Sequence, residues 1–543
     1  MARASSEAAL QRQSWRGTAY SILAVMFGAI QMPYSLGQMG WAWGLAGIAA
    51  SAVSTWSSGH LIKDACLETG ARSYPALGGA AFGRTGQLVV VASQWLAYFL
   101  TGVTQLAYGA VGWQQTFDSL QGSGDTDDAS SSSRGHTAAS SLCVEGWQLA
   151  IAVALAPCVM VPAFGDAVVL SVLVIGAQVL GLSVATAQIA HNGRYVDEGL
   201  CYSKGVTLSS SLAALSNTAF AFGGHGVFPE LMREMRDPTE FSKALNVAYA
   251  IAVPAYLGFG ILAFWAFGNA ASANFVENLR RTRAVDAYNW INSVSTFPLI
   301  VINQVALFLN VELAVNVLPT DWCVNSVYAI DVVTTCEDDE EASTIYVALD
   351  DDQSSSCRPQ QQPARRRPRR RGSAADDDDD DAWSTRSSLR AVKEGLGQFP
   401  PVLVRAVFRL GYLCAMYLCS SALVGAGLGD LTDLAGALGI AALTFYLPFV
   451  IYAKLFWSRL SRVAVAWGAV NVLFGLFVAG TGIYYAGRKV VRADVQFFKE
   501  SSCREGAFFW GNDLWDDGPP RNTSRAYKTV VVGCCRDGRT CGE

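Results

Sequence analysis

Two stretches of this sequence place glycine and proline together inside apolar segments. The first reads Gly28-Ala29-Ile30-Gln31-Met32-Pro33-Tyr34, and the second reads Phe222-Gly223-Gly224-His225-Gly226-Val227-Phe228-Pro229. Glycine permits unusual backbone dihedrals, and proline removes a hydrogen-bond donor and kinks a helix. Amides freed at the start of a half-helix attract a carboxylate, and carbonyls freed at its end attract an ammonium group or a cation. The pair of breaks therefore predicts a site for a small zwitterion.

The elements that must position these breaks are membrane helices. Hydrophobic residues make up 51% of the 543 residues and charged residues 16%, and the mean hydropathy is +0.26. An ordinary soluble protein carries about 25% charged residues. Since one span needs about 20 apolar residues, we expect an all-α polytopic membrane protein with about eleven spans. They lie near 17–36, 41–62, 87–113, 147–163, 166–190, 209–231, 245–268, 287–312, 402–424, 433–456 and 464–486.

The two breaks fall in the first and the sixth predicted spans, five spans apart. Such spacing is what two inverted repeats of five helices produce, with the substrate between the breaks and one further helix after the second repeat. Irregular backbone at membrane depth must line a cavity or be buried in protein. The alternative is that glycine and proline are simply frequent in membrane helices.

The segments between the spans predict the topology. Lys and Arg favour a cytosolic N-terminal arm over 1–16, and we see no cleaved signal peptide in it. Eleven spans then place the flexible loop 118–146 and the tail 487–543 on the outer side, with the blocks 17–312 and 402–486 in the membrane. The tail carries four clustered cysteines and the sequon Asn522-Thr523-Ser524, which both suit an outer or luminal compartment.

The segment 313–401 is predicted to be a disordered cytosolic insertion. It holds a basic run over 365–371, interrupted by Pro368, and an acidic run over 376–381. A solvated charged loop is the plain interpretation, and contact of the basic run with anionic lipid is the alternative.

The sequence resembles the amino acid/auxin permease family of eukaryotic transporters over about 14–315, and more loosely over 402–486. The resemblance is carried by the first break, continuing to Trp41, and by further motifs that read Ser73-Tyr74-Pro75-Ala76-Leu77-Gly78, Ala81-Phe82-Gly83, Phe220 to Glu230, Met235-Arg236-Asp237-Pro238 and Phe241 to Leu245. It implies a leucine-transporter-type fold and secondary transport of amino acids. By motif position it implies that the substrate contacts Gly28, Ala29, Gln31, Phe222, Gly223 and Gly224.

Two polar residues are candidates for ion coupling. His225 lies within the second break, where it could carry a proton or hold a freed carbonyl as a neutral side chain. Asn303 lies in the eighth span, where it could help to bind a cation or make an ordinary interhelical hydrogen bond. We expect coupling to H⁺ rather than to Na⁺.

The sequence contains no P-loop, nucleophile elbow or zinc motif, so we expect neither an enzyme nor an ATP-driven pump, and no metal or other cofactor. The expected partners are an amino acid substrate and the lipid bilayer, without nucleic acid, and the expected state is a monomer. The predicted location is the plasma membrane or a vacuolar or other endomembrane. Proton-coupled symport by alternating access is the predicted function. An amino-acid-sensing receptor that signals through the cytosolic insertion is the alternative.

Overall fold

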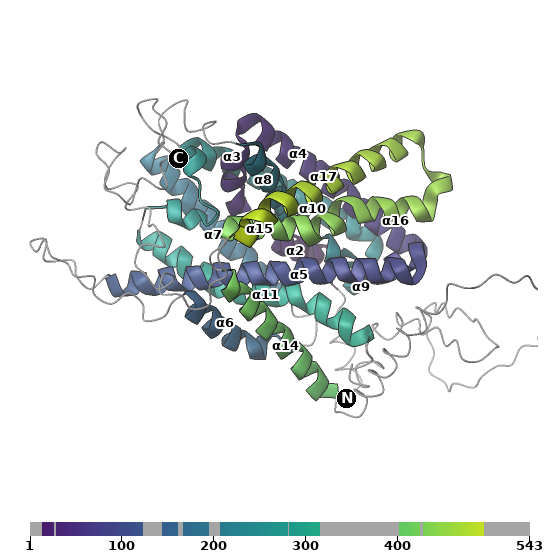
Figure 1. Ribbon diagram of the computed structural model, residues 1–543, viewed down its shortest axis with the longest axis horizontal. Helices are drawn as coiled ribbons and strands as arrows, with labels where there is room; N and C mark the ends of the chain where they lie inside the picture. Colours follow the sequence, from purple (N-terminus) through teal and green to yellow (C-terminus); the bar gives the residue numbers. More distant parts are fainter. Residues whose placement is uncertain are drawn as a thin grey trace, which may run out of the picture. The chain divides into compact units, whose positions relative to one another are not determined.

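The computed structural model describes residues 13–26, 29–122, 144–160, 167–194, 207–280, 282–314, 401–423 and 427–492. Within these ranges all regular elements are helical, and Gln13 and Met235 form the isolated β-bridge that we observe there. The described parts of 1–312 and 405–543 belong to one compact unit (Figure 1). The predicted insertion 313–401 lies almost wholly outside the described residues, as do most of the outer loop, most of the N-terminal arm and the tail from 493 onward.

Among the described residues, five helical stretches are long and apolar enough to cross a bilayer: Tyr74–Phe117, Leu170–Asn192, Pro238–Ala270, Leu403–Ala422 and Arg462–Val491. A sixth span is formed by Leu428–Ile440 and Ala442–Arg459 if that bent pair is counted as one. The helices α4 (Trp41–Thr69) and α11 (Arg283–Ala314) also exceed the length of about 20 residues that a span requires. The all-helical, multi-pass class predicted from the sequence is therefore confirmed.

Both Gly–Pro stretches interrupt a helix. The first apolar segment forms α2 (Trp15–Met26), a short turn η1 (Ala29–Gln31) and α3 (Met32–Met39). The second forms α8 (Leu208–Ala221), η3 (His225–Val227) and α9 (Phe228–Glu234). Proline stands in the first turn of both α3 and α9, where its missing amide costs no helical hydrogen bond.

The two broken helices run antiparallel to each other. At one end, the amide of Gln13 donates to the carbonyl of Glu234 over 2.7 Å, which places the start of α2 beside the end of α9. At the other end, Ser211 Oγ donates to the carbonyl of Gln38 over 3.1 Å, which places the end of α3 beside the start of α8. Each half of one broken helix thus meets the opposite half of the other.

The remaining helices surround this pair: α5 (Tyr74–Gly122), α6 (Val144–Cys158), α7 (Ala167–Asn192), α10 (Phe241–Phe267), α14 (Pro401–Ala422), α15 (Leu428–Ala435), α16 (Leu447–Phe456) and α17 (Arg462–Arg492). The helix α10 packs against α2, η1 and α3, whereas α15 and α17 pack against α8. Two π-helical segments, Gly436–Ile440 (η9) and Ala442–Tyr446 (η10), join α15 to α16.

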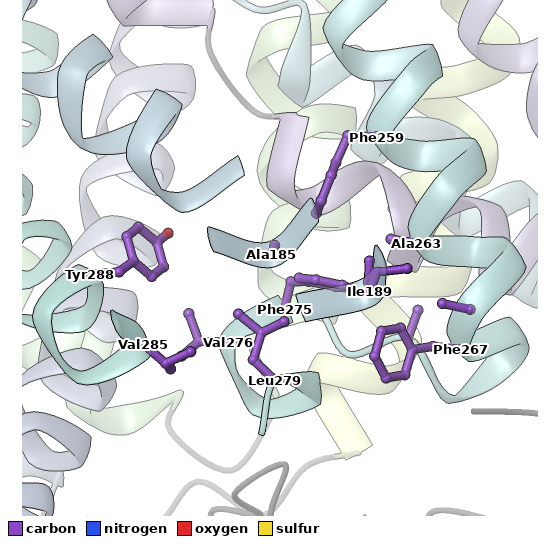
Figure 2. Close-up of a cluster of buried hydrophobic side chains, with 12 residues drawn as sticks. Ala185, Ile189, Phe259, Ala263, Phe267, Phe275, Val276, Leu279, Val285 and Tyr288 are labelled. Carbon is purple, nitrogen blue, oxygen red and sulfur yellow. The ribbon is translucent and has the colours of Figure 1, made fainter. Parts of the chain in front are cut away.

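A buried apolar cluster fixes the connection between α10 and α11 (Figure 2). Phe275, in the short turn η6 (Phe275–Asn278), meets the ring of Phe259 edge to face at 5.1 Å and that of Phe267 at 5.6 Å. Tyr288 and Val285 of α11 and Ile189 of α7 complete the cluster. Aromatic pairs of this kind bury much apolar surface, so the turn is held firmly against the bundle.

Candidate functional site

A small cavity lies at the second break. Its volume is about 50 Å³, which at about 10–15 Å³ per water leaves room for about three to five water molecules. Its walls come from α2, α5, the break between α8 and α9, α11, and the π-helical region. The lining residues are Val25, Ala97, Tyr98, Thr101, Gln105, Phe220, Gly223, Gly224, Gly226, Asn303, Ile440, Leu443 and Thr444.

The structure brings three of the predicted site residues to this cavity, namely Gly223, Gly224 and Asn303. Phe222 lies beside it, fully buried, with its ring 4.9 Å from the ring of Tyr256 on α10. Gln31 ends η1 and is not among the lining residues. Gly28 lies outside the described residues, and so does the side chain of Ala29.

The glycines of the second break leave space that a side chain would fill. A methyl group at Gly223 would come within 2.7 Å of Ile440 Cγ2, and one at Gly226 within 2.5 Å of the Tyr98 hydroxyl. Ordinary carbon contacts are about 3.5–4.0 Å, so even alanine would crowd the cavity wall. The backbone itself therefore forms this wall.

The backbone of the break offers donors and has one of its acceptors occupied. Among the described residues, the amides of Gly224 and Gly226 have no hydrogen-bond partner, although both residues line the cavity. The carbonyl of Gly226 accepts a hydrogen bond of 2.7 Å from Gln94 Nε2 on α5. Free amides at the start of a helical segment are suited to bind an anion such as a carboxylate.

The carbonyl ends of the two broken helices meet at one side chain. The Tyr256 hydroxyl, fully buried on α10, contacts the carbonyl of Met26, the last residue of α2. It also lies 2.9 Å from the carbonyl of Ala221, the last residue of α8. This hydroxyl therefore stands between the two negative helix ends, where a cation would otherwise be attracted.

Comparison with known proteins identifies the family of this chain. Residues 11–486 match the family model described as transmembrane amino acid transporter protein. The chain belongs to this family. Three similar proteins are amino acid transporters of Arabidopsis thaliana: AVT1B, 24% identical over 56% of this chain and 53% of the relative; AVT1H, 26% over 50% and 60%; and AVT1E, 24% over 46% and 45%.

Membership in the amino acid transporter family confirms the resemblance seen in the sequence. The chain spans about half the length of the curated relatives it matches. Together with the apolar helices, the family identifies a multi-pass integral membrane protein. The family is one of transporters, which is consistent with the prediction that the chain is not an enzyme. No cluster of three or more His, Cys, Asp or Glu that could hold a metal occurs within the described residues.

His225 is not among the residues that line the cavity, and its ring contacts α4. Its Nε2 lies 2.8 Å from the backbone carbonyl of Thr55, so this nitrogen carries the hydrogen and donates it. The ring also packs against Phe228, with centroids 4.5 Å apart. These contacts tie the break to α4, while the buried Nδ1 of the same ring has no hydrogen-bond partner among the described residues.

Asn303 and its neighbour Gln304 have different surroundings. Asn303 donates through Nδ2 to the carbonyl of Leu299 in its own helix, over 3.0 Å, while the residue lines the cavity. Gln304 donates to the Tyr98 carbonyl over 2.9 Å and accepts from the Tyr412 hydroxyl over 2.8 Å. Gln304 thus ties α11 to α5 and α14, as interhelical amides do, whereas Asn303 bonds within its own helix at the cavity wall.

Sequence reasoning missed the role of Tyr256. The signal available was weak, because Tyr249 and Tyr256 stand seven residues apart in an apolar span, a spacing that indicates only a shared helix face. The position of a hydroxyl between two carbonyls depends on how α10 crosses the breaks, and a single sequence does not carry that information.

Proposed function

We propose that this protein transports amino acids across a membrane and that it binds them at the second break. The observation that carries the proposal is the pair of free amides at Gly224 and Gly226 beside a small cavity. The substrate carboxylate would accept from these amides. Asn303 offers a side-chain oxygen to the substrate ammonium or to a coupling cation. Phe222 and Gly223 shape the wall, and Gly28, Ala29 and Gln31 are proposed to complete the site from the first break.

We further propose eleven spans with two inverted repeats of five, working by alternating access. The antiparallel contact of the two broken helices supports this arrangement. The spans would be α2 with α3, α4, α5, α6, α7, α8 with α9, α10, α11, α14, α15 with α16, and α17. The membrane would be the plasma membrane or an endomembrane.

Coupling to protons, by symport, is favoured over coupling to sodium. A sodium ion needs several oxygen ligands, and carbonyls freed at helix ends commonly supply them. Here the carbonyls of Met26 and Ala221 are already in contact with the Tyr256 hydroxyl. Buried ionisable side chains do occur in the spans, at Glu230 and Asp433, and such groups mark proton pathways.

The test is uptake of a panel of radiolabelled amino acids into proteoliposomes with an inward proton gradient and without sodium. We expect accumulation of at least one amino acid that collapses with a protonophore. Gly223→Val should abolish it because the side chain fills the cavity, whereas Gly258→Ala on α10, with open space around the added methyl, should not. Absence of accumulation by the folded protein, both without and with sodium, would refute the proposal and favour the receptor alternative.

A further inference from the structure

One of the buried acids lies close to the first broken helix and has no role in the site described above. Asp433 belongs to α15, and only 1% of its surface is exposed. Its Oδ1 has no hydrogen-bond partner among the described residues. Asp433 stands at the first position of the tenth predicted span, and the sequence analysis did not single it out.

The charged groups around Asp433 do not neutralise it by direct contact. The helix α15 packs against α5, α8, α17 and η9. The cation on α17, Lys489, instead forms an ion pair of 2.8 Å with Asp430, one turn earlier on α15 and more exposed. The segments α8 and η9 contribute no titratable side chain. Asp433 is thus the buried, unpaired member of two acids on one helix.

Two tyrosines connect Asp433 to the first break. The hydroxyls of Tyr34 on α3 and Tyr108 on α5 lie within electrostatic range of Asp433, and neither donates a hydrogen bond to its Oδ1. Gly429 lies four residues before Asp433, on the same face of α15, and a methyl group there would overlap the Tyr34 hydroxyl. The Tyr34 side chain therefore lies directly against the helix face that carries Asp433.

The contacts of Tyr108 extend in two further directions. Its side chain lies near that of Gln31, the last residue of η1 in the first break. Its hydroxyl donates to the carbonyl of Ala273 over 3.1 Å, and Glu277 in the same connection lies within electrostatic range. A line of polar groups thus runs from the connection between α10 and α11, through Tyr108, to Asp433 and the first break.

We propose that Asp433 is the residue that takes up and releases the coupling proton. The inference rests on the proton coupling proposed above. In this setting a carboxyl group is stable as the neutral acid, whereas its anion requires donors or a cation nearby. Uptake converts the carboxylate and a proton from water into the acid. Release returns the proton to water and leaves an anion that the hydroxyls of Tyr34 and Tyr108 would have to approach. Since Tyr34 is part of α3, the protonation state of Asp433 biases the position of the first broken helix.

The test compares Asp433→Asn with wild type in two assays of the full-length protein in proteoliposomes. Asparagine imitates the neutral acid, so the variant should exchange labelled for unlabelled amino acid across the membrane at a rate within about threefold of wild type. It should lose accumulation driven by the proton gradient by at least about tenfold, together with the substrate-dependent proton influx reported by an internal pH dye. Asp430→Asn is the matched control, because it removes the acid paired with Lys489 and should keep both activities.

The possible results separate the inference from the proposed function. Accumulation and proton influx at the wild-type level in Asp433→Asn would overturn the role of Asp433. Loss of exchange together with accumulation would also overturn it, because that pattern indicates a purely structural role. If wild type itself shows no proton-driven accumulation, the proposed coupling fails first. If Asp433→Asn does not fold, Asp433→Glu carries the test: it should shift the pH of half-maximal uptake, and an unchanged pH profile would overturn the proposal.

Discussion

Removing the Tyr256 hydroxyl tests whether one side chain holds the two helix ends together. In Tyr256→Phe the carbonyls of Met26 and Ala221 lose this donor at membrane depth. Leaving a buried polar group unsatisfied costs about 1–3 kcal/mol. We take this cost to destabilise the conformation that binds the substrate. At about 1.4 kcal/mol per factor of ten, the apparent affinity for the substrate should then fall about 5- to 150-fold.

The measurement is the concentration dependence of amino acid uptake into proteoliposomes, with and without sodium. We also expect sodium to restore part of the affinity of Tyr256→Phe, because a cation can take the place that the hydroxyl leaves between two carbonyls. Wild type should show no such response. Tyr288→Phe is the matched control. Tyr288 is 1% exposed and Tyr256 is 0% exposed, and among the described residues the Tyr288 hydroxyl makes no hydrogen bond. A Tyr256→Phe variant with wild-type affinity and no sodium response would refute the reasoning.

Three further substitutions test other parts of the structure. His225→Gln keeps a donor for the Thr55 carbonyl, so uptake should still depend on the proton gradient; uptake that no longer follows the gradient would return the proton-carrying role to His225. Gly436→Ala would drive a methyl group into the Ser216 carbonyl and should cost about 1–3 kcal/mol, seen as a lower Tm in detergent, whereas Gly480→Ala, in open space, should leave Tm equal or slightly higher. Burial raises the pKa of Glu277 from its ordinary 4.5 to about 7, so the folded state binds the proton more tightly than the unfolded state. The free energy of unfolding should therefore fall as pH rises from about 4.5 to 7 and then level off. Glu277→Gln should flatten this part of the profile of Tm against pH, and an unchanged profile would contradict the assignment.

The broken helices could be predicted from the sequence because their cause is local. Glycine weakens a helix at any depth, and in both stretches a proline that follows shortly after the glycines can begin a new helix. Gly28 to Pro33 and Gly223 to Pro229 therefore indicate interruptions without any knowledge of the neighbours. The same holds for the membrane class, which follows from long apolar stretches. Gly223 and Gly224 could be named as site residues for this reason, and the structure places both at the cavity.

The residues that the sequence did not reveal depend on contacts between distant segments. Arg409 stands in an apolar span where snorkelling to the interface would be expected, yet it is fully buried and donates through Nη1 to the carbonyl of Val159 over 2.6 Å. Asp433 begins its predicted span and is nevertheless only 1% exposed. The burial of each is decided by the helices that pack around it, and a single sequence specifies those only indirectly.

The π-helical segments show the same limit for backbone. Nothing local in Gly436–Ile440 or Ala442–Tyr446 distinguishes them from ordinary helix. The glycines Gly436 and Gly439 lie where neighbouring helices come closest. A methyl group at Gly439 would overlap the backbone of Ala97 on α5, and one at Gly436 would overlap the backbone of Ser216 on α8. The wider turns therefore occur where α15 and α16 are pressed between two neighbours, and π-bulges of this kind are frequent at functional sites.

These contacts give the site a definite polarity. The two carbonyl ends of the broken helices converge on Tyr256, so their partial negative charge is met inside the protein. The amides of Gly224 and Gly226 remain open beside the cavity. A zwitterion would therefore find its strongest preformed contact at its carboxylate, whereas its ammonium group depends on side-chain oxygens such as that of Asn303. Recognition of the carboxylate by backbone tolerates many amino acids, because the backbone is the same whatever side chain the substrate carries. For the transport of amino acids proposed above, selection among substrates would then come from the apolar residues that line the cavity, such as Ile440 and Leu443.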